Sequence, residues 1–157
     1  MRMDTLEQYI ERDLGRLSAS ERLWIWRRRQ TSRHARGARS RQSTVPRSGR
    51  TMTRAEAAEA LGLTVGVYAS LEVGDALLAP DERERVRGAL AAMAPPTVGE
   101  LCAVARRRGG GGLIEVERAL GVSRPRMIEL ERCGAAPVVA YWEKRGFRFP
   151  DECSQCR

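Results

Sequence analysis

The sequence is poor in lysine, histidine and aromatic side chains. Lys144 is the only lysine among 28 basic residues, His34 is the only histidine, and aromatic residues make up 5% of the 157 positions. One histidine and no recognisable pairing of a nucleophile with a base disfavour an enzyme. A core built mainly of Leu, Val and Ala favours helices over packed sheets of strands, so we expect a non-enzymatic, all-α protein.

Long apolar runs are also absent. No stretch approaches the roughly 20 apolar residues that cross a bilayer. The first 15 residues, MRMDTLEQYIERDLG, carry acidic side chains where a signal peptide requires an apolar stretch. We therefore expect a cytoplasmic protein without a membrane partner.

Metal-ligating residues are few and poorly spaced. The cysteines are Cys102, Cys133, Cys153 and Cys156. A zinc site would need all four, and their spacing is a poor match to the close pairs of known zinc sites. The glycines at 109–112 lack the Lys-Ser/Thr of a phosphate-binding loop. We expect no metal and no cofactor, and cysteines that stay reduced in the cytoplasm.

Acidic residues are missing from one stretch. Residues 27–50 contain nine arginines and no acid, whereas the whole chain has a net charge of +8, so the remainder carries a net −1. An arginine-rich composition alone, as in a GC-rich genome, would not remove the acids. Such a concentrated positive charge favours contact with a polyanion over the alternative, a solvated linker.

Capping boxes mark the starts of several helices. Each pairs Asp, Ser or Thr with a Glu three residues later, as in Asp4/Glu7, Ser18/Glu21, Thr53/Glu56 and Thr97/Glu100. After the first box, apolar residues recur at helical spacing, which predicts an amphipathic helix over residues 1–17. Its apolar face, which must pack against the first repeat or a second subunit, comprises Leu6, Tyr9, Ile10, Leu14 and Leu17.

An internal repeat is the strongest signal. EAAEALGLTVGVYASLEVG at 56–74 aligns without a gap with EVERALGVSRPRMIELERC at 115–133, an offset of 59 residues. Arg27–Arg29 match Arg106–Arg108 at an offset of 79. The difference is the length of a basic insertion over residues 31–50. The pattern predicts two copies of one helical unit, the first carrying this arm between its first two helices.

Each copy contains the pattern of a helix, a tight turn and a second helix. Gly62 and Gly121 can adopt the left-handed conformation that ends the first helix. Thr64 and Ser123 are suited to capping the second helix. In that helix one apolar side is expected to face inward, comprising Tyr68, Leu71, Met127 and Leu130.

Both copies resemble the XRE/Cro-type, lambda-repressor-like helix-turn-helix family, with ALG, a small apolar residue, Ser or Thr, and an exposed stretch ending in LE. The resemblance implies two tandem helical bundles that bind double-stranded DNA. It covers roughly 18–93 and 97–149. With it, the chain is expected to comprise an N-terminal helix at 1–17, units at 18–94 and 97–150, and a Cys-containing tail at 151–157.

The resemblance also implies where DNA would be contacted. Transferred by position, the surface that contacts bases comprises Thr64, Val65, Gly66, Ala69 and Ser70 in the first copy, and Ser123, Arg124, Pro125, Ile128 and Glu129 in the second, with Arg126 beside it. The position that contacts phosphate at the start of the preceding helix is Arg54 in one copy and Leu113 in the other.

The basic stretch supplies the remaining candidate contacts. Arginines beside Gly and Ser suit an arm that lies along phosphates or enters a minor groove. Besides Arg54, the candidates are Arg28, Arg29, Arg33, Arg36, Arg39, Arg41, Arg47 and Arg50.

The two copies depart from the family pattern in different ways. The first has no charged or amide side chain on the helix that would contact bases, so it could reach only thymine methyl groups or the backbone. The second has Arg124 and Arg126, but Glu117 replaces the small residue that is Ala58 in the first copy. One copy could therefore serve packing or dimerisation.

Two classes of function follow. The first is a sequence-specific transcriptional regulator, encoded by a phage or mobile element and associated with the nucleoid. The second is an adaptor whose helical units bind proteins while the arm binds nucleic acid without sequence preference. RNA in place of DNA, a protein of the transcription machinery as partner, and a homodimer all remain open.

Overall fold

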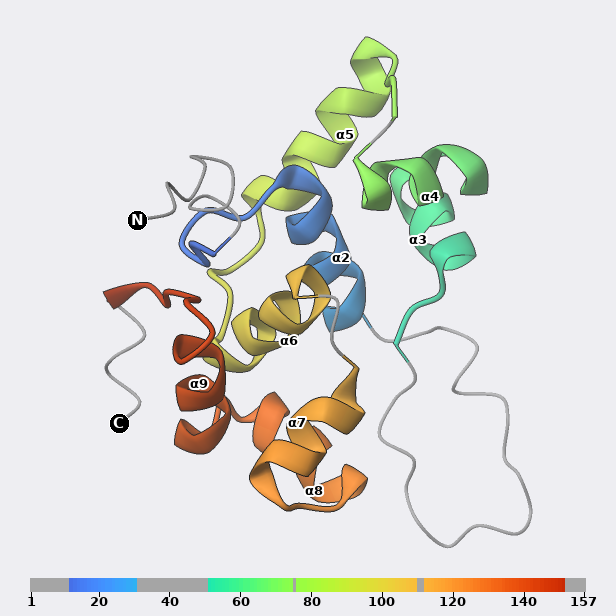
Figure 1. Ribbon diagram of the computed structural model, residues 1–157. Helices are drawn as coiled ribbons and strands as arrows, with labels where there is room; N and C mark the ends of the chain where they lie inside the picture. Colours follow the sequence, from blue (N-terminus) through green and yellow to red (C-terminus); the bar gives the residue numbers. More distant parts are fainter. Residues whose placement is uncertain (1–11, 31–50, 75, 110–111, 152–157) are drawn as a thin grey trace, which may run out of the picture. The chain divides into compact units, whose positions relative to one another are not determined.

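The computed structural model describes residues 12–30, 51–74, 76–109 and 112–151 (Figure 1). Within these ranges the protein consists of α-helices and contains no β-strand, which confirms the all-α prediction. The chain divides into two compact units, one of Ser18–Ala94 and one that joins Met1–Leu17 to Pro95–Arg157. None of the described helices is long and apolar enough to cross a bilayer.

The unit Ser18–Ala94 contains α2 (Ala19–Arg29), α3 (Arg54–Leu61), α4 (Val65–Val73) and α5 (Pro80–Ala91). Ser18 and Thr53 form the predicted capping boxes of α2 and α3 with the glutamates three residues on. Helix α5 begins at a proline, which suits a first turn because its missing N–H would have no helical partner there.

The second unit contains α6 (Val98–Arg108), α7 (Leu113–Leu120), α8 (Arg124–Arg132) and α9 (Ala136–Glu143). The predicted capping box of Thr97 and Glu100 starts α6. Gly121 ends α7 in the left-handed conformation, as expected.

The repeat in the sequence is also a repeat of tertiary contacts. Helix α6 begins and ends 79 residues after α2, whereas α7 and α8 lie 59 residues after α3 and α4. In the first unit α4 contacts α2 and α3, and α5 contacts the same two helices. In the second, α8 and α9 each contact α6 and α7. Corresponding helices therefore make corresponding contacts.

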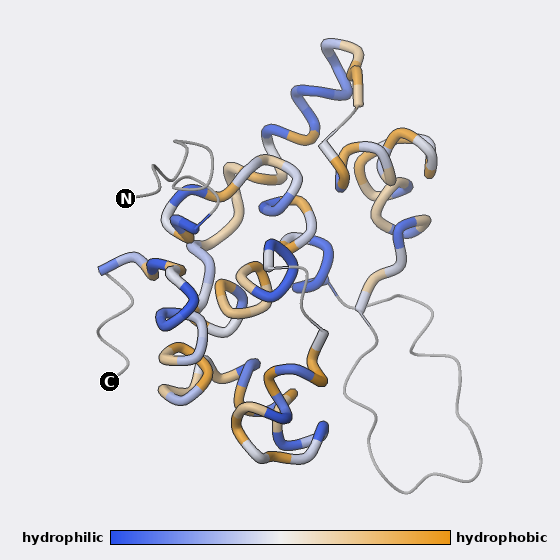
Figure 2. Tube along the Cα trace, viewed as in Figure 1, coloured by the Kyte–Doolittle hydropathy of each residue, from blue (hydrophilic) through white to orange (hydrophobic). Residues whose placement is uncertain are grey.

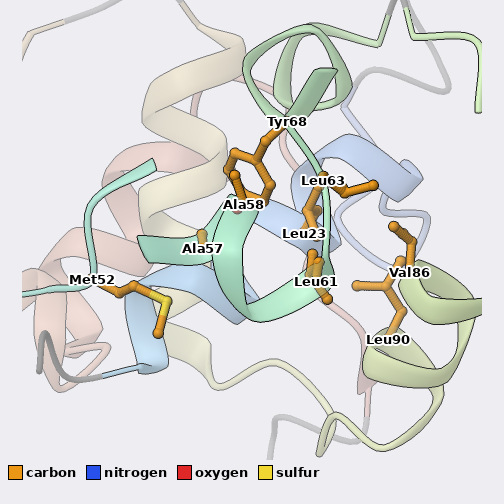
Figure 3. Close-up of a cluster of buried hydrophobic side chains, with 9 residues drawn as sticks. All are labelled: Leu23, Met52, Ala57, Ala58, Leu61, Leu63, Tyr68, Val86 and Leu90. Atoms are coloured by element: carbon orange, nitrogen blue, oxygen red, sulfur yellow. The ribbon is translucent and has the colours of Figure 1, made fainter. Parts of the chain in front are cut away.

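The core of the first unit is a cluster from all four helices and the segment before α3 (Figure 3). Its members are Leu23, Met52, Ala57, Ala58, Leu61, Leu63, Tyr68, Val86 and Leu90. Helix α5 is largely hydrophilic along its length, and only its inward side contributes to this cluster (Figure 2).

Corresponding positions fill the core of the second unit. Cys102 and Val104 take the places of Leu23 and Ile25, Val116 that of Ala57, and Met127 that of Tyr68. All are at most 1% exposed. Tyr141, Trp142 and Phe147 complete this core through edge-to-face ring contacts with centroid distances of 4.9 and 5.5 Å.

The segment before Ser18 departs from the prediction. Residues 12–17 form turns, so the expected helix does not extend over them; residues 1–11 lie outside the described part of the chain. Leu14 is buried in the second unit, where its N–H donates to the carbonyl oxygen of Arg148 at 2.9 Å. Arg108 donates to the carbonyl oxygens of Asp13 and Arg16 at 3.1 and 2.8 Å. These bonds favour the second unit over the expected packing on the first.

Helices α6 and α8 approach closely at Gly99. A β-carbon built at this position would overlap the backbone carbonyl oxygens of Arg132 and Glu131. Backbone cannot yield as a flexible side chain can, so the close packing of α8 on α6 requires glycine here.

We expect Gly99→Ala to lower the free energy of unfolding by about 3 kcal/mol or more, since the added methyl group would force the two helices apart. Gly88→Ala in α5 is the matched control, because a β-carbon there meets nothing within 4 Å. It should stabilise by about 0.5–1 kcal/mol. Denaturant unfolding measures both, and equal stabilities would contradict the close approach of α6 and α8.

Candidate nucleic-acid interface

The same tight turn joins the two short helices of each unit. Gly62 between α3 and α4 has φ 63° and ψ 37°, and Gly121 between α7 and α8 has φ 64° and ψ 33°. These are left-handed conformations that glycine adopts without a steric penalty. Leu63 and Val122, next in the chain, donate to the carbonyl oxygens of Ala58 and Glu117. The predicted turn geometry is thus confirmed in both copies.

A buried ion pair holds α4 against α2. The Glu72 side chain is 0% exposed, and its Oε1 accepts from Nε of Arg27 at 2.6 Å. Oε2 accepts from Nε of Arg54 at 2.8 Å. Burial by itself would raise the pKa of the Glu72 carboxyl, but hydrogen bonds from Arg27 and Arg54 outweigh it and hold that pKa below its ordinary value.

The second unit contains the equivalent pair. Arg106 donates from Nε and Nη2 to the two carboxylate oxygens of Glu131 at 2.9 and 3.1 Å. This two-pronged arrangement fixes α8 on α6 as Arg27 and Glu72 fix α4 on α2. No counterpart of the Arg54 contact exists, because the corresponding position is Leu113.

Tyr68 lies beneath the first of these pairs. Its ring is fully buried, and its hydroxyl has no hydrogen-bond partner of ordinary geometry among the described residues. Burial, followed by the negative charge of Glu72, raises the pKa of this hydroxyl far above its usual range. The prediction that Tyr68 and Met127 face inward is confirmed, since both are 0% exposed.

The outward side of α4 is small and uncharged. Thr64 caps the helix through its Oγ1, which accepts from the N–H of Val67 at 3.2 Å. Val65 and Gly66 are exposed next to it, and Ala69 and Ser70 are half-buried. Figure 2 shows α4 mostly in apolar colours. This surface offers methyl groups, one hydroxyl and backbone N–H groups to a partner.

The outward side of α8 is charged. Ser123, Arg124, Pro125 and Arg126 are all exposed, and Ser123 occupies the predicted cap position without a side-chain cap bond. The Arg124 Nε lies 2.8 Å from Oε1 of Glu117 in α7. The remaining two exposed side chains of this surface are Glu129, whose Oε2 lies 3.1 Å from Nη1 of Arg126, and Ile128.

The basic stretch begins inside the fold. Arg27, Arg28 and Arg29 form the last turn of α2, where cations favour the helix dipole. Arg28 stacks its guanidinium 4.5 Å from the Trp24 ring centre, and Arg29 donates to the carbonyl oxygen of Ala94 at 2.7 Å. Arg33, Arg36, Arg39, Arg41, Arg47 and Arg50 lie outside the described residues.

Counting arginines therefore overstated the charge available for a partner. Arg27 is only 15% exposed and is neutralised by Glu72. Arg54, which the family resemblance implies as a phosphate contact, shares the same carboxylate but is 54% exposed. Arg28, Arg29 and Arg54 remain candidate contacts through their exposed parts.

The roles of Glu72, Glu131 and Glu117 were not foreseen from the sequence. A signal for the first two was present, because an arginine and a glutamate recur together in both copies at matching offsets. For Glu117 the only sign was an acid in place of Ala58. Opposite charges that recur, or change, together between repeats can thus indicate ion pairs.

The cysteines in the described residues lie apart from this surface chemistry. Cys102 is buried in the core and Cys133 is exposed at the end of α8, and both are free thiols. No cluster of three metal-binding side chains occurs in the part of the chain that the structure describes. Cys153 and Cys156 lie outside it.

Comparisons with protein families, curated proteins and solved structures gave no match to this chain.

The Glu72 pair generates a prediction about stability. Glu72→Gln should lower the free energy of unfolding by about 3–5 kcal/mol, because it leaves Arg27 buried without its counter-charge. Glu59→Gln, at an exposed position of α3, is the control and should change it by less than about 0.5 kcal/mol.

The same pair predicts acid sensitivity. A carboxyl whose pKa is lowered by folding contributes stability above its unfolded pKa, about 4.3, and loses it as the pH falls through the folded pKa. Urea unfolding between pH 7 and pH 3 should therefore show a smaller loss of stability for Glu72→Gln than for the wild type. Parallel curves would show that Glu72 does not titrate as inferred.

Proposed function

We propose that the protein binds double-stranded DNA as a sequence-specific transcriptional regulator. In this proposal α3–α4 and α7–α8 act as tandem helix-turn-helix units of the XRE/Cro type, and the basic arm at 31–50 contacts phosphates or a minor groove. The observation that carries it is the twice-repeated arrangement of helix, left-handed glycine turn and second helix, each held by a buried Arg–Glu pair.

The exposed beginnings of α4 and α8 support this proposal. In helix-turn-helix proteins the first residues of the second helix enter the major groove and meet base edges. Here Thr64 and Val65 begin α4, and Ser123 and Arg124 begin α8, and all four are exposed. Their side chains are accessible to a duplex.

Under this proposal α8 discriminates between sequences more strongly than α4. Guanidinium groups can make paired hydrogen bonds to guanine, whereas Val65 and Ala69 can only contact thymine methyl groups. The ion pairs of Arg124 and Arg126 are at exposed positions, where such pairs contribute little and can exchange partners.

The position of the arm also fits this function. The N–H of Met52 donates to the carbonyl oxygen of Gln30 at 3.0 Å, so the chain leaves and re-enters the fold at adjacent points. Six arginines between these points can therefore contact DNA without being part of the helical core. Phosphate neutralisation of this kind supplies affinity without sequence preference.

An adaptor is the second candidate, and one observation favours it. Apolar side chains are exposed at and beyond the end of α4, where Val73 is 70% and Leu77 is 98% exposed, and Val65 at its start is 51% exposed. A protein partner could cover such a surface. In this case α4 would bind protein and only the arm would bind nucleic acid.

A DNase footprint separates the two functions. Selection from a pool of random duplexes by the full chain should yield a preferred sequence, and the chain should then protect a defined site containing it. Protection spread evenly along any DNA would contradict the regulator and favour the adaptor. Tighter binding to structured RNA than to the selected duplex would contradict DNA as the target.

The arm has its own test. Because Gln30 and Met52 are adjacent, residues 31–50 can be replaced by a short Gly-Ser linker without separating α2 from α3. If about four arm arginines neutralise phosphates, the slope of log K against log salt should become shallower by roughly 3–4 units.

Two full-length variants control for the length of the arm. Changing its six arginines to glutamine should give the same shallow slope, whereas changing them to lysine should preserve the wild-type slope. An unchanged slope in the linker variant would show that the arm is a spacer.

A further inference from the structure

Glu117 and Arg124 form a contact between the two helices that would meet DNA. Glu117 lies in the middle of α7 and is 16% exposed, and Arg124 is the first residue of α8. The Nε of Arg124 donates to Oε1 of Glu117 at 2.8 Å. The carboxylate therefore engages the guanidinium on its inner side, while the side chain of Arg124 remains 54% exposed.

The first unit provides an internal comparison. The residues that correspond to Glu117 and Arg124, at an offset of 59, are Ala58 and Val65. Ala58 is buried in the core, and Val65 is exposed. Both members of the pair are thus present in one unit and both are replaced by apolar residues in the other, as expected if they act together.

Electrostatics explains why Arg124 needs such a partner. A cation at the first turn of a helix lies at the positive end of the helix dipole, where it is disfavoured. A carboxylate close to the guanidinium offsets this repulsion. A charged hydrogen bond at Nε also restricts a side chain that otherwise loses considerable rotamer entropy when it binds.

The atom that is engaged determines what Arg124 can still bind. With Nε occupied, the guanidinium retains the N–H groups of Nη1 and Nη2 at its tip. Guanine presents O6 and N7 side by side in the major groove, and arginine contacts them with two parallel hydrogen bonds. A guanidinium fixed from behind can present both terminal nitrogens to that edge with less loss of freedom.

We propose that Glu117 is a positioning residue, which orients Arg124 so that α8 selects guanine at one base pair of the DNA site. This inference rests on the proposed function and names the base that the second unit recognises. Glu117 contacts no DNA itself. As an acid near phosphates it weakens binding to any duplex, and its positioning effect is confined to sites that carry the guanine.

Opposite effects on two kinds of DNA make this inference testable. The full chain, with sites selected from random duplexes, is compared on three DNAs: the preferred site, the same site with the contacted G·C pair changed to A·T, and a random duplex. Arg124→Ala identifies that pair as the one whose preference it abolishes. Fluorescence anisotropy at fixed salt gives each Kd.

We expect Glu117→Gln to bind the preferred site about five- to tenfold more weakly, because the fixed orientation of Arg124 is lost, and to bind random duplex as well as or slightly better than the wild type. Glu115→Gln is the matched control. It makes the same change of charge at an exposed position of α7 two residues earlier, and should raise affinity for all three DNAs in parallel. Thermal unfolding of each variant verifies that the fold is intact.

The double variant Glu117→Gln/Arg124→Ala supplies the coupling. If Glu117 acts through Arg124, it should discriminate no less than Arg124→Ala alone.

Three results would overturn the inference. If Glu117→Gln strengthens binding to all three DNAs as Glu115→Gln does, Glu117 restrains Arg124 from DNA or acts only through its charge. If Arg124→Ala lowers affinity equally on all three, Arg124 contacts phosphate. Both results leave DNA recognition by the protein intact, whereas a pool that yields no preferred sequence overturns the proposed function together with this inference.

Discussion

The buried pair of an arginine on the first helix and a glutamate at the end of the third is the interaction on which each unit depends. Helices of eight or nine residues such as α3, α4, α7 and α8 are too short to be stable alone in water. Their positions must therefore be fixed by tertiary contacts. Arg27–Glu72 and Arg106–Glu131 fix them at the end of the third helix, and the tight glycine turn fixes them at its start. Between these two points the outward side of the helix is free to vary.

The two units have used this freedom differently. In the first, Glu72 also binds Arg54, and α4 presents a small, uncharged surface. In the second, an acid on α7 and arginines on α8 make a charged surface over a core that is otherwise equivalent. The common scaffold tolerates both, because its stability comes from inward positions such as Tyr68 and Met127. Tandem units with unequal surfaces suit an asymmetric partner better than a palindromic one.

The sequence predicted much of the scaffold, for identifiable physical reasons. Capping boxes at Ser18, Thr53 and Thr97 located helix starts, because the pattern satisfies backbone donors locally. The repeat offsets placed corresponding helices, and glycine identified the turns. The segment before Ser18 was assigned wrongly over 12–17, since apolar spacing cannot show that Leu14 would pack beside Arg148 in a turn. The partners of individual arginines were also unpredictable, because Arg27 and Arg28 are identical in sequence terms and only the fold buries one of them.

This distinction between committed and available arginines bears on how DNA binding would divide between arm and helices. Without residues 31–50, the sequence from 18 to 94 contains eight arginines and eight acids. The helical part of that unit therefore has no net charge with which to attract a polyanion, and Arg27 and Arg54 already share Glu72. Attraction must come from the arm if the unit is to bind nucleic acid at all. Orientation and choice of sequence, in contrast, require side chains held rigidly, and among the exposed arginines at the start of α8 Arg124 is the one held by a carboxylate from another helix. Affinity and specificity would thus reside in different parts of the chain, which allows each to change without destabilising the other.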